Sequence, residues 1–141
     1  VGLELRHANV LAEAESVWNI NTLMNDVLAT QVESSELNEL FVKEESGELS
    51  AAETMRVGSW AIMWLNVYET QWKFHDKNIV SHEDFEGYAA AACWEITNVT
   101  VIRDTWRVLG ESYSLGFQQF VAEECPKLVD ILDDTRREDG E

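Results

Sequence analysis

Two histidines, His75 and His82, lie seven residues apart, and acidic residues flank both of them: Asp76, Glu83 and Asp84. Imidazole and carboxylate groups are common ligands of transition metals, so this segment is a weak candidate for a metal site. However, the spacing matches no standard site, and helix capping and helix dipoles account for the same residues without a metal. We predict no bound metal and no cofactor, with His75 and His82 as the candidates if a metal is present.

A di-iron centre is the first enzymatic hypothesis for an acidic helical chain. It needs a Glu-x-x-His pair on each of two helices and two further inward glutamates. Only Glu4 and His7 have this spacing. Glu69 and Glu95 fall on polar faces of the predicted helices, where we expect solvated carboxylates. Motifs for serine or cysteine nucleophiles and for phosphate-binding loops are also absent, which favours a protein that is not an enzyme without deciding the question.

The two cysteines, Cys93 and Cys125, match no zinc-binding spacing and are too few for a disulfide framework. Cys93 lies in an alanine-rich run beside Trp94, where a free thiol packs like a small apolar side chain. We therefore expect both cysteines to be reduced, as is usual in the cytoplasm. The predicted location of the chain is cytoplasmic.

The charge of the chain is strongly negative, with 27 acidic and 10 basic side chains among 141 residues and a net charge of −17. Nucleic-acid binders need a basic face that neutralises phosphates, so we predict no nucleic-acid partner. The longest apolar run, Val57 to Tyr68, is shorter than the ~18 residues that cross a bilayer. We therefore expect no membrane insertion by this segment itself.

The elements that must position these residues are predicted to be helices. One proline and seven glycines favour long helices with few turns. The apolar periodicity predicts an all-α, antiparallel helical bundle of about four main helices plus short helices, with a long N-terminal helix. Residues 1–125 form a single domain in this prediction. Residues 126–141 form an acidic C-terminal tail that we expect to fray.

The third predicted helix, from about residue 51 to residue 76, is rich in aromatic residues. Trp60, Trp64 and Tyr68 recur every four residues, on one face of this helix. A helix that is apolar on most sides is expected at the centre of the fold, here packed on the alanine-rich face of the next helix. A plain core explains this pattern. The alternative is that Trp64, Tyr68 and Trp72 line a pocket for a small ligand.

The first predicted helix, from about residue 3 to residue 31, carries a stripe with alternating spacings of four and three residues: Leu3, His7, Val10, Ala14, Val17, Asn21, Met24 and Leu28. Polar residues within such a stripe often determine register or partner choice. We therefore predict an interaction surface at His7, Val10, Val17 and Asn21, with a second copy of the chain as the expected partner. The alternatives are that His7 and Asn21 are polar groups satisfied within one copy, or that the helix rotates its stripe slightly.

Several segments together resemble a family of uncharacterised bacterial all-helical domains. They are NVYETQW at 66–72, NIVSHEDFEGY at 78–88, Trp106, and SLGFQQFV at 114–121. The resemblance covers roughly residues 51–124 and implies no known activity, cofactor or substrate. Family members often follow one or two N-terminal membrane helices. Because the chain starts at Val1 without a methionine, the resemblance also implies a membrane anchor upstream, with the first helix as a stalk.

The sequence thus predicts a non-enzymatic helical interaction or structural domain, tethered to a membrane by a segment upstream of Val1. The alternative function is a metal- or small-ligand-binding bundle. Such a bundle would use the loop between His75 and His82 or the Trp-rich third helix.

Overall fold

The computed structural model describes residues 2–138. These residues form helices and no strand, which confirms the all-α prediction. The helices are α1 (Gly2–Glu33), α2 (Ser35–Ser46), α3 (Ala51–Asp76), α4 (His82–Asn98), α5 (Thr100–Leu109), α6 (Leu115–Glu123) and α7 (Cys125–Glu138). A short 3₁₀ turn, Gly110–Ser112, joins α5 to the segment that leads into α6.

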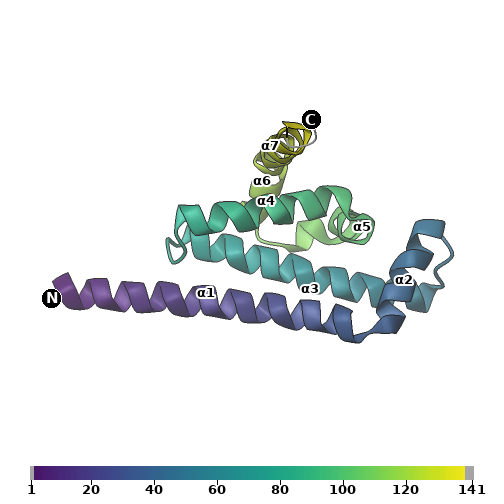
Figure 1. The fold of residues 1–141 in the computed structure, drawn as a ribbon, viewed down its shortest axis with the longest axis horizontal. Coiled ribbons are helices and arrows are strands. Elements are labelled where there is room, and N and C mark those ends of the chain that lie inside the picture. Colours follow the sequence, from purple (N-terminus) through teal and green to yellow (C-terminus); the bar gives the residue numbers. More distant parts are fainter. Residues whose placement is uncertain (1, 139–141) are drawn as a thin grey trace.

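Three long antiparallel helices make the body of the molecule, with α3 between α1 and α4 (Figure 1). The helices α2 and α5 lie at one end of this layer, and α6 and α7 lie on the side of α4 (Figure 1). The N-terminal part of α1 extends past the α3–α4 loop at the opposite end (Figure 1). The predicted long first helix is therefore present, and its first turns project from the body.

The core is centred on α3, as predicted. The three residues expected on its inner face, Trp60, Trp64 and Tyr68, are buried, and so are Val57, Ala61 and Val67. The facing residues of α4 are small near its middle, where Ala89 and Ala92 are buried, and larger toward its ends, at Phe85 and Ile96. This distribution lets two helix axes approach closely while the bulky rings of α3 fill the space beside them.

Serine side chains cap the start of three of the helices. Ser34 accepts a hydrogen bond from the backbone N–H of Leu37 at the start of α2. Ser50 and Glu53 form a reciprocal capping box at the start of α3. Ser81 accepts from the backbone N–H of residue 84 at the start of α4. These caps fix where the chain enters each helix.

The loop between α3 and α4 turns at Asn78, which has a positive φ of 55°. Asparagine tolerates this left-handed conformation better than most residues. The next residues bend back on α3, because the N–H of Ile79 donates to the carbonyl of Phe74 over 2.8 Å. Val80 is consequently buried against Phe85 and Ala89 of α4. This turn brings the two histidines at the ends of the loop close together.

The C-terminal segment differs from the fraying tail that its acidic composition predicted. Residues Cys125–Glu138 form α7, which packs against α4. Val129 is buried in a cluster with Cys93 and Cys125, and Leu128 packs against it. Apolar contacts on one side of α7 therefore outweigh the repulsion among its acidic residues. Residues 139–141 of the predicted tail lie outside the described residues.

The face of α1 that meets the core overlaps the predicted stripe only in part. Ile20 and Val27 are the buried residues of this helix, and Met24 packs between them on the same side. Most of the predicted stripe lies on another face and is exposed. Only the C-terminal half of α1 lies against α3, so the apolar residues of that half determine how the whole helix is rotated. Within the described residues, no helix is long and apolar enough to cross a membrane.

Candidate functional site

A pocket of about 430 Å³ opens where α2, the middle of α3 and the junction between α4 and α5 meet. Its wall combines three aromatic side chains with three carboxyl groups: Phe41, Trp60, Trp64, Glu44, Glu45 and Glu95. The rest of the lining comes from Leu28, Gln31, Asn98, Val99, Thr100 and Val101. None of these lining residues is a lysine, arginine or histidine. The pocket is therefore both aromatic and negatively charged.

The aromatic side of the pocket is built by the four-residue repeat of α3 and by one ring from α2. Trp60 and Trp64 make an edge-to-face pair with centroids 6.3 Å apart, and Phe41 packs on Trp60 at 4.7 Å. Trp64 stacks on Tyr68 behind it at 5.6 Å. The indole Nε1 of Trp60 is buried without a hydrogen-bond partner. Such an unpaired buried donor is uncommon in proteins.

Two of the carboxyl groups are held partly away from water. Glu95 of α4 accepts a hydrogen bond from the hydroxyl of Tyr68. Burial raises the pKa of Glu95, although the Tyr68 hydrogen bond acts in the opposite direction. Burial also raises the pKa of Glu44, and the nearby negative charge of Asp104 adds to that increase. The expectation that Glu95 is a solvated carboxylate is wrong, because α4 turns this residue toward α3.

Glu69 is the second glutamate for which the expectation of a solvated carboxylate is wrong. Its carboxylate accepts hydrogen bonds from Lys73 and from both the backbone N–H and the hydroxyl of Ser114. Burial alone would raise the pKa of Glu69, but these hydrogen bonds outweigh burial and lower it. Ser114 precedes α6 yet makes no side-chain cap, since its hydroxyl is used by Glu69. Glu69 therefore joins α3 to the start of α6.

Of the three residues predicted to line a ligand pocket, only one lies in the pocket wall. Trp64 lines the pocket, and Tyr68 reaches it only through Glu95. Trp72 lies elsewhere, packed against Phe117 of α6 with ring centroids 6.2 Å apart. The contributions of α2 and α4 to the pocket could not be predicted from the sequence, because helical periodicity does not reveal which distant helices meet. One local feature of the sequence points to this pocket: an aromatic and an acidic residue of α2, Phe41 and Glu44, have i,i+3 spacing and therefore share a helix face.

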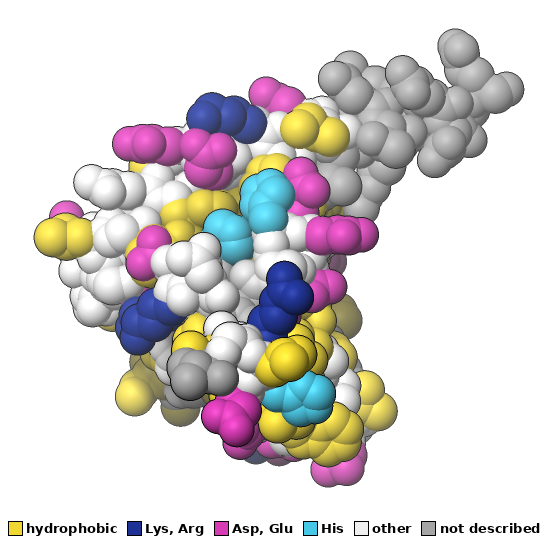
Figure 2. All heavy atoms as spheres, turned by 90° about the vertical axis from the view of Figure 1, so that its left-hand side faces the viewer, with side chains coloured by type: hydrophobic (Ala, Val, Ile, Leu, Met, Phe, Trp, Pro, Cys, Tyr) yellow, Lys and Arg dark blue, Asp and Glu magenta, His cyan; other side chains and the backbone are white. Residues whose placement is uncertain are grey.

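The two candidate metal ligands do lie together. His82 Nδ1 is 3.4 Å from His75 Nε2. Figure 2 faces the end of the molecule that carries the α3–α4 loop and shows histidine side chains side by side there. The His75 ring also stacks on Phe85 at 4.1 Å. Burial and the charge of His82 lower the pKa of His75. Among the described residues, no group of three or more His, Cys, Asp or Glu side chains is placed to hold a metal ion.

The residues predicted for interaction share one side of α1 but differ in their exposure. His7 and Val10 are exposed, and hydrophobic side chains surround this end of α1 in the lower part of Figure 2. Val17 is half-buried against the cluster that contains Ile20. Asn21 is exposed and accepts a hydrogen bond of 3.0 Å from the Tyr88 hydroxyl.

We define the outer stripe of α1 as the exposed residues Leu3, His7, Val10, Leu11, Ala14 and Trp18. Their spacing places all of them on one helix face, and that face contains no Asp, Glu, Lys or Arg in this half of α1. The exposed fractions of Leu3, Val10 and Trp18 are 82%, 64% and 72%. An apolar face this exposed is uncommon unless another surface covers it.

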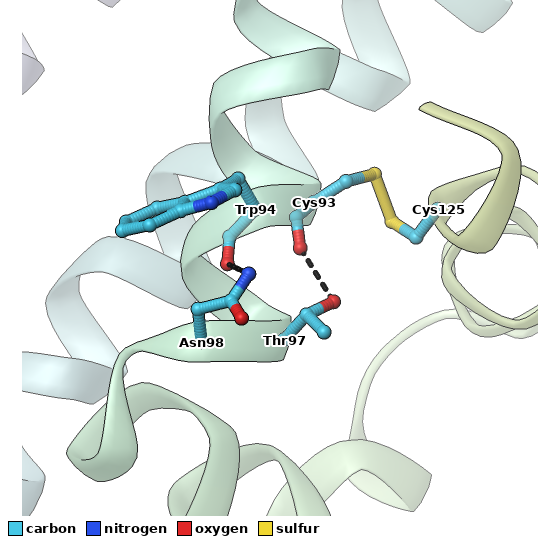
Figure 3. Close-up of a disulfide and its surroundings, with 5 residues drawn as sticks. All are labelled: Cys93, Trp94, Thr97, Asn98 and Cys125. Carbon is cyan, nitrogen blue, oxygen red and sulfur yellow. Dashed lines mark hydrogen bonds between the residues drawn. A yellow bond between two sulfur atoms is a disulfide. The ribbon is translucent and has the colours of Figure 1, made fainter. Parts of the chain in front are cut away.

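The two cysteines form a disulfide, so the expectation that both are reduced is wrong. Cys93 of α4 and Cys125 of α7 are bonded, with their Cα atoms 4.8 Å apart (Figure 3). On the same helix, Thr97 donates to the carbonyl of Cys93 and Asn98 donates to that of Trp94 (Figure 3). A separation of 32 residues in the sequence concealed this proximity.

The fold and these sites define a disulfide-linked, all-helical protein with an acidic aromatic pocket and an exposed apolar helix face. Comparisons with protein-family models, with curated proteins and with solved structures find no match to this chain.

Proposed function

We propose that this chain is a non-enzymatic interaction domain that pairs with a second copy of itself through the outer stripe of α1. The observation that carries the proposal is the exposure of large apolar side chains at helical spacing along the projecting half of this helix. Burying them against another helix would remove them from water, and each large side chain contributes about 1.5–3 kcal/mol when fully buried.

A second copy fits this face better than a charged partner does. The chain has a net charge of −17, so two copies repel each other over most of their surfaces. The outer stripe is free of charged side chains, which lets two acidic molecules meet there without burying like charges. The alternating three- and four-residue spacing is that of a helix that pairs along a seam, and His7 is a polar group that can fix the register.

Size-exclusion chromatography with light scattering tests the pairing directly. We expect a dimer at micromolar concentration, and we expect a double variant, Val10→Glu with Trp18→Glu, to be monomeric. Both side chains are exposed, so the fold of one copy is retained while negative charge enters the paired face.

The matched control is the double variant Leu5→Glu with Leu23→Glu. Leu5 and Leu23 are exposed apolar residues of α1, as Val10 and Trp18 are, but they lie on a different face of the helix. The control should remain dimeric despite the same change in net charge. A wild-type chain that stays monomeric up to roughly 100 μM, or a control as disrupted as the stripe variant, contradicts the proposal.

We further propose that the domain works in an oxidising compartment. The cytoplasmic prediction depended on reduced cysteines, and the Cys93–Cys125 bond removes that basis. Structural disulfides persist mainly in oxidising surroundings. The membrane anchor implied by the family resemblance is compatible with this location, and α1 would then serve as the stalk between the anchor and the body.

The alternative function, binding of a small ligand, is supported by one observation of its own. The aromatic pocket lies on the Trp-rich α3 helix, as that hypothesis requires. The His75–His82 version of the alternative has less support, because the two imidazoles lack a third ligand among the described residues.

A further inference from the structure

We propose that the pocket between α2, α3 and α4 binds a small organic cation, such as a quaternary or alkylated ammonium group, between the aromatic wall that includes Trp60 and Trp64 and the carboxylates of Glu44 and Glu95. This inference concerns a site separate from the outer stripe. It goes beyond the pairing proposed above and does not depend on it.

The aromatic side of the pocket is suited to a cation. The faces of tryptophan rings carry negative electrostatic potential and attract ammonium groups that lie within about 6 Å. Trp60 and Trp64 are oriented at 79° to each other, and Phe41 lies at 59° to Trp60, so the rings present differently directed surfaces. The rings of Trp60 and Trp64 are largely buried, and the parts that stay exposed border the pocket.

The carboxyl groups determine the sign of charge that the pocket accepts. Glu44 and Glu95 take part in no salt bridge among the described residues, although both are partly withdrawn from water. No basic side chain lines the pocket, and Arg103, which does not line it, acts on Glu44 through its charge. A partly desolvated carboxylate gains from a close counter-charge, which a cationic ligand in the pocket would supply.

The dimensions of the pocket restrict the ligand to a small molecule. A volume of about 430 Å³ lies within the range of pockets that hold metabolites and similar compounds. Compact inorganic cations prefer shells of oxygen ligands, whereas three aromatic rings occupy much of this wall.

Isothermal titration calorimetry with choline as the probe tests the proposal. We expect saturable binding in the micromolar to millimolar range, and we expect 3,3-dimethylbutanol to bind at least about tenfold more weakly. The alcohol has nearly the same shape as choline but carries no charge. Equal binding of the two compounds, or no saturable binding of choline below about 10 mM, would overturn the proposal.

Variants locate the binding to the pocket. Glu95→Gln and Glu44→Gln should each weaken choline binding by about tenfold, and Glu39→Gln, which removes a carboxylate elsewhere on α2, should leave it unchanged. Trp64→Phe keeps an aromatic core residue while reducing the attraction for a cation, and should also weaken binding. Circular dichroism identifies any variant that does not fold. The variants that do fold then show whether choline binds in the pocket. An equal effect of Glu39→Gln and the pocket variants contradicts the proposed site.

Failure of this proposal is distinguishable from failure of the pairing proposal. The variant Val10→Glu with Trp18→Glu changes only α1 residues that do not line the pocket. It should bind choline as the wild type does, whatever its oligomeric state. Loss of choline binding in this variant would contradict a site confined to the pocket.

Discussion

Two glutamates of the bundle, Glu69 and Glu95, show how one residue type is used in opposite ways. Glu69 is stabilised in its charged form by Lys73 and by two hydrogen bonds from Ser114. Glu95 has only the Tyr68 hydroxyl as a donor, and burial dominates its surroundings. The folded state therefore favours ionisation of Glu69 and protonation of Glu95.

Glu69→Gln should destabilise the protein at pH 7 by about 1–3 kcal/mol, because it weakens hydrogen bonds to a partly buried charged acceptor. The pKa of Glu69 is lower in the folded state, so its contribution to stability is present above the unfolded-state pKa and is lost as the pH falls through the folded-state value. Urea denaturation between pH 7 and pH 3 measures this change. A stability difference that stays constant over that range contradicts the assignment.

Glu95→Gln should show the opposite pH dependence. The pKa of Glu95 is raised in the folded state, so the ionised side chain disfavours folding at neutral pH, and this penalty disappears below the unfolded-state pKa. The variant should therefore be most favoured relative to wild type near pH 7 to 8, and should lose that relative advantage as the pH falls. The same urea titrations report it. A relative advantage that grows toward low pH would show that Glu95 is not desolvated.

At the scale of the elements, α6 packs tightly against α3 at Gly116. A Cβ atom added at Gly116 would lie 2.8 Å from Cζ2 of Trp72 and closer still to Cη2. Trp72 cannot easily move, because its ring also packs against Phe117. Gly116→Ala should therefore destabilise the protein by about 1–3 kcal/mol through overpacking, as measured by thermal unfolding.

Gly87→Ala is the control for this prediction. Gly87 lies inside α4, and nothing is within 4 Å of a Cβ added there. Alanine in an exposed helix interior is favoured over glycine, so this variant should be more stable than wild type by about 0.5–1 kcal/mol. If both variants shift stability in the same direction, steric contact with Trp72 does not explain the effect at Gly116.

Local sequence signals predicted the elements better than their contacts. The burial of Trp60, Trp64 and Tyr68 on the inner face of α3 was predicted correctly, because it depends on residues within a few positions of one another. The stripe of α1 was predicted as an interaction surface, and only part of it meets the core, because the helix carries apolar residues on two faces. Periodicity alone cannot tell which of them a neighbouring helix covers.

For the molecule as a whole, the features that escaped prediction all join distant parts of the chain. The pocket brings Phe41 and Glu44 of α2 to Glu95 of α4, and Glu69 reaches Ser114 across 45 residues. The same is true of the helical conformation of residues 125–138, which follows from packing on α4 rather than from their acidic composition. Trp64, which lines the pocket, was predicted as a ligand contact because it belongs to the aromatic repeat of its own helix.

The Cys93–Cys125 disulfide is the covalent link between the bundle and its C-terminal helix. It closes a segment of 32 residues that contains α5 and α6. In the chain-entropy account, such a link stabilises a protein mainly by restricting its unfolded state, by about 2–4 kcal/mol for a loop of this size. Breaking it should also loosen α7, since Val129 and both cysteines form one buried cluster.

We therefore expect the double variant Cys93→Ala with Cys125→Ala to unfold at lower urea concentration than wild type, with a loss of about 2–4 kcal/mol. Reductant should lower the stability of the wild type toward that of the variant and should leave the variant itself unchanged, which separates loss of the bond from loss of sulfur packing. Hydrogen exchange should increase first in α7, because its packing on α4 is held at Cys125. Two thiols titrating in the unfolded, non-reduced wild-type protein would contradict the bond, whereas none would support it and the oxidising compartment that it implies.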